Sequence, residues 1–147
     1  VIVDFAHTPD SFEKIFQDLA PVTKGKLIAM FGSAGRRDEA KREVQGELAG
    51  KYCDIVVVTE EDDRDADGIK ILEEIAEGAE KSGKIKDQNL FLIHDRTEAI
   101  KRTLELAKSG DTVLLLGKGH EKTIERANGP EPWNEIETTH ELLKNLS

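Results

Sequence analysis

Two short segments combine glycines with cationic side chains, and each directly follows an apolar run. In FGSAGRRD, residues 31–38, Arg36 and Arg37 follow two glycines. Guanidinium groups bind carboxylates or phosphates through paired hydrogen bonds, and the amino end of a helix attracts anions. In GKGHE, residues 117–121, two glycines flank a lysine and leave the backbone accessible. Both segments therefore predict a site for a small anionic or zwitterionic ligand.

Neither segment matches a standard phosphate-binding motif. The dinucleotide fingerprint GxGxxG and the P-loop GxxxxGK[ST] are both absent from the 147 residues. Spacing alone thus leaves a second interpretation open for each segment. The first could be a tight turn with two solvated arginines, and the second a glycine-rich turn with a surface lysine.

The most acidic stretch is EEDDRDAD, residues 60–67, in which Arg64 is the lone cation. This composition is typical of a solvated charge cluster ahead of a helix. Carboxylates can bind a hard cation, but the spacing is not that of an EF-hand loop, so we expect no metal site. The single cysteine, Cys53, excludes a disulfide framework and a zinc site made of cysteines, and we expect it to face the core.

Asp4 and His7 lie at the end of the first apolar run, just before Thr8 and Pro9. Thr8 suits the N-cap of a helix, and Pro9 suits its first turn. A carboxylate at a strand end can bind a ribose or order a loop. His7 either has a capping and packing role or contacts a ligand.

Apolar runs and helical patterns alternate along the chain and must position these residues. Continuous hydrophobicity in the runs indicates strands that are covered on both faces, as in a parallel sheet. The runs are VIVDF (1–5), KLIAMF (26–31), DIVVVT (54–59), NLFLIH (89–94) and DTVLLLG (111–117). Between them, apolar residues recur at helical spacing: Phe12, Ile15, Phe16 and Leu19; Ala40, Val44 and Leu48; Leu72, Ile75, Ala76 and Ala79; Ala99, Ile100, Thr103, Leu104 and Ala107.

This alternation predicts a Rossmann-like α/β fold: a doubly wound, mostly parallel sheet of about six strands with helices on both faces. Gly78 weakens the third helix. Residues 122–126 are the candidate sixth strand, 128–132 are expected to turn or loop, and Asn134 with Glu137 resembles a capping box. Ligands of such sheets bind beyond the carboxyl ends of the strands, so the polar segments should meet at one edge.

Length and charge narrow the class of protein. A chain of 147 residues suggests one domain. The 21 Lys and Arg residues against 30 Asp and Glu give a net charge of −9, which argues against nucleic acid or an anionic membrane as a partner. No apolar run approaches the ~20 residues of a membrane span. A single cysteine fits a reducing, cytoplasmic compartment. The chain starts inside a strand at Val1 without a methionine, which favours a domain cut from a longer protein.

Three stretches together resemble the C-terminal domain of the Mur ligases: residues 4–16, 31–42 and 95–121. The resemblance covers nearly the whole chain and implies one domain, 1–147, of a cytoplasmic bacterial enzyme. It implies an ATP-dependent ligase that adds the third amino acid to UDP-MurNAc-L-Ala-D-Glu through an acyl phosphate, for peptidoglycan precursors. An N-terminal domain would hold the UDP-sugar, and a central domain would bind most of the ATP and Mg²⁺. The isolated domain should be inactive, with no catalytic residue of its own.

The resemblance also implies site residues for the amino acid. Arg37 matches an arginine that binds its carboxylate. Gly117 and Glu121 match positions that contact its distal end in diaminopimelate-adding members. Arg64 matches the arginine of the specificity motif DNPR, and Asp62 stands where the motif has an asparagine that meets the amino acid.

The chain departs from the family pattern where specificity is set. DNPR reads EDDR over residues 61–64, and the usual GCGGDRD reads GSAGRRD. The retained Arg64 favours meso-diaminopimelate, whereas the added negative charge favours L-lysine. Either interaction reaches about 4 kcal/mol at about 4 Å and an effective dielectric constant near 20. We expect diaminopimelate. Asp4 and His7 match a segment that lies beside the nucleotide when the domain closes.

Other classes remain open. A looser version of the first motif occurs in folylpolyglutamate and cyanophycin synthetases. A stand-alone nucleotide- or amino-acid-binding module could use the same sheet edge without catalysis. A receiver-like domain would need paired acidic residues and a strand-end lysine. A flavodoxin-like domain would need an aromatic-rich loop, against which one Tyr and one Trp argue.

Overall fold

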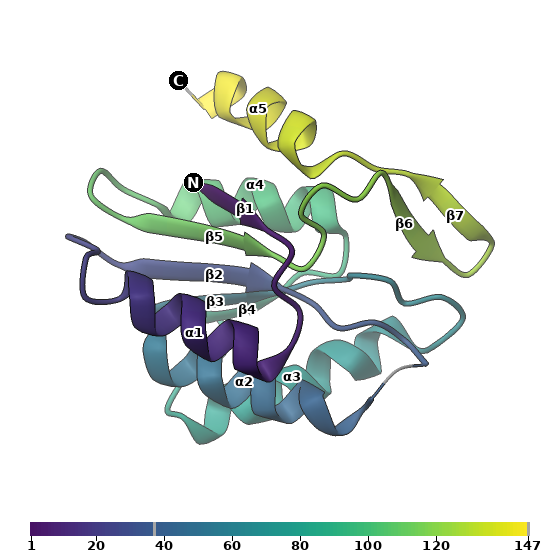
Figure 1. Ribbon diagram of the computed structural model, residues 1–147, viewed down its shortest axis with the longest axis horizontal. Helices are drawn as coiled ribbons and strands as arrows, with labels where there is room; N and C mark the ends of the chain where they lie inside the picture. The colour runs from purple at the N-terminus through teal and green to yellow at the C-terminus, as the bar shows by residue number, and fades with distance from the viewer. Residues whose placement is uncertain (37, 147) are drawn as a thin grey trace.

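The computed structural model describes residues 1–36 and 38–146. Within them, the expected apolar runs form one parallel sheet in the order β1-β5-β2-β3-β4 (Figure 1). β5 lies between β1 and β2, so the carboxyl ends of these strands are neighbours. The strands are β1 (Ile2–Asp4), β2 (Leu27–Phe31), β3 (Ile55–Val58), β4 (Leu90–Leu92) and β5 (Thr112–Leu116).

Helices cover both faces of the sheet, as predicted (Figure 1). One face packs against α1 (Pro9–Leu19), α2 (Ala40–Tyr52) and α3 (Gly68–Lys81). The other face packs against α4 (Arg96–Leu106) and α5 (Glu135–Leu146). Alternate residues of β2 enter the two cores, which explains the continuous hydrophobicity of the run.

The sheet has five strands rather than six. β6 (Thr123–Arg126) forms where a sixth strand is predicted, but it pairs antiparallel with β7 (Gly129–Pro132) in a separate hairpin. The predicted loop over 128–132 is therefore wrong for most of its length. Pro130 and Pro132 lack a backbone N–H, which suits a two-stranded ribbon better than the middle of a sheet. The hairpin stands beyond the carboxyl ends of the strands (Figure 1).

The buried face of α2 differs from the predicted stripe. Val44 is 43% exposed, whereas Gln45, Gly46 and Ala49 face inward. The reason is close contact with α3: a Cβ on Gly46 would lie 2.0 Å from the carbonyl oxygen of Ile75. Gly78 serves the same contact from α3, so the residue expected to weaken this helix is where the two helices touch.

Local signals predicted from single residues are confirmed. Thr8 caps α1 by accepting a hydrogen bond from the backbone N–H of Ser11, with Pro9 in the first turn. Asn134 accepts one from the N–H of Glu137 at the start of α5. Cys53 is buried, and burial raises the pKa of its thiol. Among the described residues, no helix has the length and apolar character that crossing a membrane requires.

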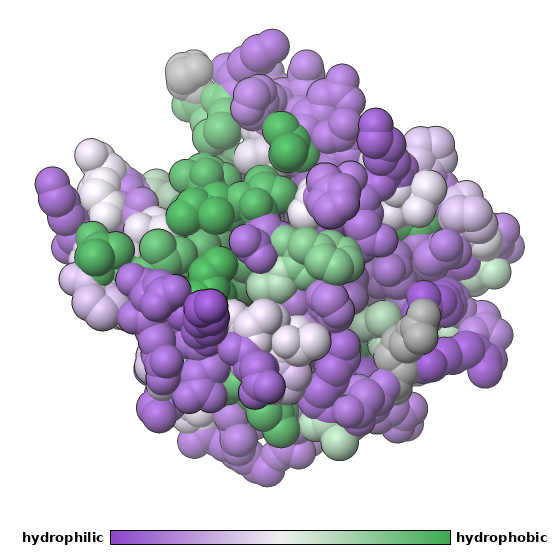
Figure 2. All heavy atoms as spheres, in the orientation of Figure 1, coloured by the Kyte–Doolittle hydropathy of each residue, from purple (hydrophilic) through white to green (hydrophobic). Residues whose placement is uncertain are grey.

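Apolar and charged surfaces lie at different places on the molecule. Val1 and Ile2 at the open edge of β1 are exposed, as are Leu143 and Leu146 of α5. Figure 2 shows apolar side chains gathered around the N-terminal strand, and mostly polar ones around the hairpin side. The polar side is the one at the carboxyl ends of the strands (Figure 1 and Figure 2).

Candidate functional site

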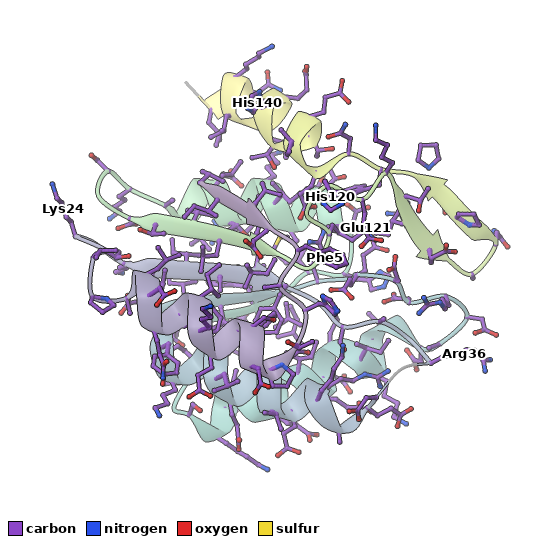
Figure 3. All side chains as sticks on the ribbon, viewed as in Figure 1. Phe5, Lys24, Arg36, His120, Glu121 and His140 are labelled. Carbon is purple, nitrogen blue, oxygen red and sulfur yellow. The ribbon has the colours of Figure 1, made fainter. Side chains whose placement is uncertain are left out.

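The carboxyl ends of β1, β2, β3 and β5 surround one open pocket of about 440 Å³, here called the strand-end pocket. Residues distant in sequence meet there because parallel strands bring all their carboxyl ends to one edge. In Figure 3, Phe5, His120 and Glu121 lie together at this edge. The lining residues are Phe5, His7, Thr8, Ala34, Asp38, Lys41, Glu61, Asp62, Arg64, Gly117 and Glu121.

Most of the predicted site residues line this pocket: His7, Asp62, Arg64, Gly117 and Glu121. Asp4 does not. Its Oδ1 accepts a hydrogen bond from the backbone N–H of Ala6 at 2.8 Å, and its side chain lines a depression beside α1 instead. Arg37 lies outside the described residues, so the structure does not bear on its predicted contact.

Lys118 neutralises Asp62, which lines the pocket. Its side chain has no exposed surface, and Nζ lies 2.8 Å from Asp62 Oδ1 and 3.6 Å from Glu121 Oε1. Asp62 also accepts a hydrogen bond from the backbone N–H of Glu125 in β6 at 2.8 Å. The interpretation of GKGHE as a turn with a surface lysine is therefore wrong. Asp62 contributes less free negative charge than its sequence position suggests.

Gly117 and Glu61 form part of the pocket wall together. Gly117 has φ 108°, and a Cβ there would lie 2.2 Å from Glu61 Oε1. The Glu61 side chain makes no hydrogen bond or ion pair within residues 1–36 and 38–146, although the residue is only 6% exposed. Burial raises the pKa of Glu61 and Asp62 adds to this, while Arg96, Lys41 and Lys118 oppose it. The pocket thus contains a carboxyl group without a hydrogen-bond or ion-pair partner among residues 1–36 and 38–146.

Arg64 supplies a cation on the same wall. Its backbone has φ 56°, in the left-handed region. Nη1 donates to the carbonyl oxygen of Gly35 at 2.8 Å, and its backbone N–H donates to Glu125 at 3.2 Å. In the part of the chain that the structure describes, Arg64 forms no ion pair. It can therefore bind a ligand carboxylate without first breaking an ion pair with a described residue.

An aromatic group forms the rim. The Phe5 ring lies 4.7 Å from the His7 ring and 6.0 Å from the His120 ring, between centroids. The His7 ring nitrogen Nδ1 is 2.9 Å from the carbonyl oxygen of Phe5. The His7 carbonyl oxygen accepts hydrogen bonds from Lys41 and Gln45 of α2, at 3.2 and 2.9 Å. These bonds fix the loop after β1 against the helix after β2.

Next to the pocket lies a second group of charges, the buried ion-pair cluster: Glu60, Arg96, Arg126 and Glu135. Arg96 is fully buried and donates to both carboxylate oxygens of Glu135, at 2.8 and 2.7 Å. It also donates to the backbone carbonyls of Glu60 and Leu116, at 2.7 and 2.9 Å. Burial by itself would lower the pKa of Arg96, but Glu135, Glu61 and Glu60 together raise it above its usual value. Arg96 thereby joins the ends of β3 and β5 to α4 and α5.

Only the second half of the acidic run is a solvated charge cluster ahead of a helix, since Asp65 and Asp67 are exposed and Asp67 caps α3. The first half is mostly buried. Glu60, Glu61 and Asp63 are only 3, 6 and 7% exposed. Glu60 pairs with Arg126 at 2.9 Å, and Asp63 contacts His94 at 2.5 Å. The sequence signal that was missed is the run's place directly after a buried strand, which carries its first residues inward.

Arg36 plays no part in either group. It pairs with Asp65, and both side chains are more than half exposed. Figure 3 shows Arg36 at the tip of its loop, away from the strand-end pocket. For Arg36, the exposure fits the prediction of a solvated arginine in a turn, and Arg36 does not line the strand-end pocket.

Comparisons with known proteins agree with one another. A family model described as "Mur ligase, glutamate ligase domain" matches residues 1–119. A UDP-N-acetylmuramyl-tripeptide synthetase of Roseiflexus sp. is 50% identical over 99% of this chain and 29% of its own length. A UDP-N-acetylmuramoyl-L-alanyl-D-glutamate–2,6-diaminopimelate ligase of Aquifex aeolicus is 38% identical over 97% of this chain and 29% of its own.

Solved structures give the same picture. A UDP-N-acetylmuramoyl-L-alanyl-D-glutamate–2,6-diaminopimelate ligase superposes with a TM-score of 0.89 at 31% identity, covering 98% of this chain and 29% of that one. A domain of a ligase from Haemophilus ducreyi superposes with a TM-score of 0.57 at 16% identity, over 99% of this chain and 89% of that one, which shows a common fold. The chain spans about 29% of the length of the first of these relatives.

Proposed function

The chain belongs to the Mur ligase family, and from this we propose that it is the C-terminal domain of an ATP-dependent ligase that adds the third amino acid to UDP-MurNAc-L-Ala-D-Glu. The names of the relatives from Roseiflexus and Aquifex support this activity. On this proposal the enzyme works in the bacterial cytoplasm on peptidoglycan precursors. An N-terminal and a central domain of the same polypeptide would bind the UDP-sugar and the nucleotide.

The observation that carries the proposal is the strand-end pocket. It collects charges of both signs, Arg64 and Glu61 among them, that have no ion-pair partner among the described residues. An amino acid presents the complementary arrangement, because it carries a carboxylate and an ammonium group on a short chain. A pocket whose unpaired charges were all of one sign would suit a simple anion or cation instead.

The role of this domain is to position the amino acid. On the proposed reaction, ATP supplies the phosphoryl group that activates the substrate carboxylate. The amino group then attacks the acyl carbon, and phosphate leaves. The described residues include no P-loop, so ATP and Mg²⁺ would bind mainly in the central domain. Holding the amine in line with the acyl carbon lowers the entropic barrier. His7 at the rim would lie beside the nucleotide when the domain closes.

The pairing of Asp62 favours diaminopimelate as the third amino acid. Lys118 compensates Asp62, which removes most of the argument for a lysine ammonium at that point. Arg64 is available for a carboxylate, which the distal end of diaminopimelate has and that of lysine lacks. Glu121, 36% exposed at its side chain, can accept from the distal ammonium group.

The test is an assay of the complete polypeptide that contains this chain, with UDP-MurNAc-L-Ala-D-Glu, ATP and a panel of amino acids. We expect ATP-dependent formation of the tripeptide with meso-diaminopimelate, and no ATP turnover by the 147-residue chain alone. A preference for L-lysine would contradict the specificity. If the complete polypeptide ligates nothing while the chain binds an amino acid, a stand-alone binding module is the better description.

A further inference from the structure

A second cavity, of about 310 Å³, is lined, like the strand-end pocket, by residues of the segment 60–64. Its walls come from the loop after β3, the first residue of α3, the loop after β4 and the hairpin. Arg64 lines both cavities. Its lining includes Glu60, Asp63, Gly68, His94 and Arg126.

Three potential metal ligands converge in this cavity. Glu60, Asp63 and His94 each offer one ligand atom, and these atoms lie within 4.8 Å of one another. The backbone holds two of them in place, since the His94 carbonyl oxygen accepts hydrogen bonds from the N–H of Glu60 at 3.2 Å and from Thr59 at 3.0 Å. The three ligands therefore come from two adjacent strand ends, which is a rigid support.

Asp63, which lines this cavity, has one carboxylate oxygen without a hydrogen-bond partner among the described residues. Its side chain is only 9% exposed, and Oδ1 has no hydrogen-bond partner in the described structure. Buried polar atoms are almost always satisfied, because leaving one unpaired costs free energy. The other oxygen, Oδ2, lies 2.5 Å from His94 Nε2. An ion bound between the two side chains would satisfy the carboxylate.

The helix that follows leaves room at this point. Gly68 is the first residue of α3, and a Cβ there would lie 2.3 Å from both Asp63 Oδ2 and His94 Nε2. Glycine thus keeps the space next to the ligand atoms open. An alanine at this position would therefore crowd the ligand atoms while leaving all three ligands in place.

We propose that Glu60, Asp63 and His94 form a binding site for a divalent transition-metal ion such as Zn²⁺. One imidazole nitrogen with two carboxylates is a donor set for first-row transition metals, whereas Mg²⁺ and Ca²⁺ prefer oxygen ligands alone. Three protein ligands leave a coordination position for water. The bound ion would tie the loop after β3 to the end of β4 and so fix Arg64 between the two cavities.

Arg126 competes with the ion for Glu60. Its guanidinium group donates to both Glu60 oxygens, at 3.1 and 2.9 Å, and also pairs with Glu131 at 3.1 Å. A Glu60 oxygen that binds the ion would share its lone pairs with Arg126, while Glu131 keeps Arg126 at the hairpin. Arg126 therefore lowers the affinity of the site without being a ligand.

The experiment is calorimetric titration of ZnCl₂ into the metal-free 147-residue chain. We expect one equivalent to bind, and His94→Gln and Asp63→Asn each to lower the affinity at least tenfold. His140→Gln is the matched control, because His140 lies on α5 and outside the cavity. Circular dichroism of each variant checks that it folds.

Two further variants keep the test decisive if a ligand substitution unfolds the chain. Gly68→Ala should weaken zinc binding with every ligand retained. Arg126→Gln should strengthen zinc binding, since a cation that pairs with Glu60 is removed. Absence of stoichiometric binding to the wild-type chain, or an equal loss in His140→Gln, would overturn the proposal. Neither outcome bears on the ligase assignment, because the amino-acid pocket does not include His94.

Discussion

The strand-end pocket and the buried ion-pair cluster both include residues of the segment 60–64, but they use charge differently. In the cluster, Arg96 donates to both oxygens of Glu135 and to two backbone carbonyls. In the pocket, Glu61 and Arg64 form no ion pair with any residue the structure describes. The two arginines also differ in burial: Arg96 is fully buried, whereas Arg64 is partly exposed.

The difference separates charges that hold the fold from charges that can meet a ligand. A buried charge is tolerated when its partner and its hydrogen bonds are all supplied by the protein. A charge that the protein leaves without a partner keeps its capacity for an incoming group. Substitutions in the first group should therefore lower stability, and substitutions in the second should act on the substrate.

Arg96→Ala should destabilise the fold by about 3–5 kcal/mol, because Glu135 would be left buried without its cation. Chemical denaturation of the 147-residue chain measures this. Arg36→Ala is the matched control: Arg36 also has a carboxylate partner, but the pair is exposed to solvent, so the stability should stay close to that of the wild type. Equal effects in the two variants would mean that burial of the pair does not matter.

Arg64→Ala should leave the fold almost unchanged and act on the substrate. In the complete ligase we expect kcat/KM for meso-diaminopimelate to fall roughly 10- to 100-fold, since a charged hydrogen bond contributes about 1.5–3 kcal/mol. The value for L-lysine should change far less. Steady-state kinetics with both amino acids measure this. If the ratio of the two kcat/KM values does not change, Arg64 belongs with the charges that hold the fold.

Gly117→Ala should cost roughly 1–3 kcal/mol of folding free energy, because the residue has φ 108° and its Cβ would meet Glu61. Gly83→Ala separates the two causes. Gly83 has φ 96° but no atom within 4 Å of its Cβ position, so it reports backbone strain alone. Thermal denaturation of both variants should show the larger loss for Gly117→Ala; a similar loss would mean that Glu61 simply moves aside.

Asp111→Asn tests the opposite end of the sheet and should have the smallest effect, less than about 1 kcal/mol at pH 7. The backbone N–H groups of Lys26 and Lys108, each 2.8 Å from a carboxylate oxygen, hold the pKa of Asp111 below its usual value of 3.8. A pKa that is lower in the folded than in the unfolded state stabilises the fold at pH values above the unfolded-state pKa. This stabilisation is lost as the pH falls through the folded-state pKa. The difference between variant and wild type should therefore shrink in acid, as denaturation at several pH values would show.

Much of the architecture could be predicted from the sequence. The strands of the sheet, the flanking helices and the capping roles of Thr8 and Asn134 follow from periodicity and local hydrogen bonding, which act over a few residues. The gathering of His7, Arg64 and Glu121 follows as well, because parallel strands place their carboxyl ends together. The contact predicted for Arg37 stays a prediction.

The predictions that were wrong concern contacts between distant segments. Val44 was expected inside because its spacing fits a stripe, but the glycines of α2 and α3 turn another face inward. Hairpin pairing likewise removed the expected sixth strand from the sheet. In both cases the local pattern allowed two arrangements, and packing against a remote element selected one.

The order of apolar runs along this chain is enough to establish an α/β sheet with a polar edge, since hydrophobic burial depends on residue type and period. It is not enough to establish which of the edge charges are neutralised. Lys118 meets Asp62 across 56 residues, and Arg96 meets Glu135 across 39. Such pairs are made by the folded chain alone, because the electrostatic cost of burial is set by which groups the tertiary structure brings within hydrogen-bonding distance.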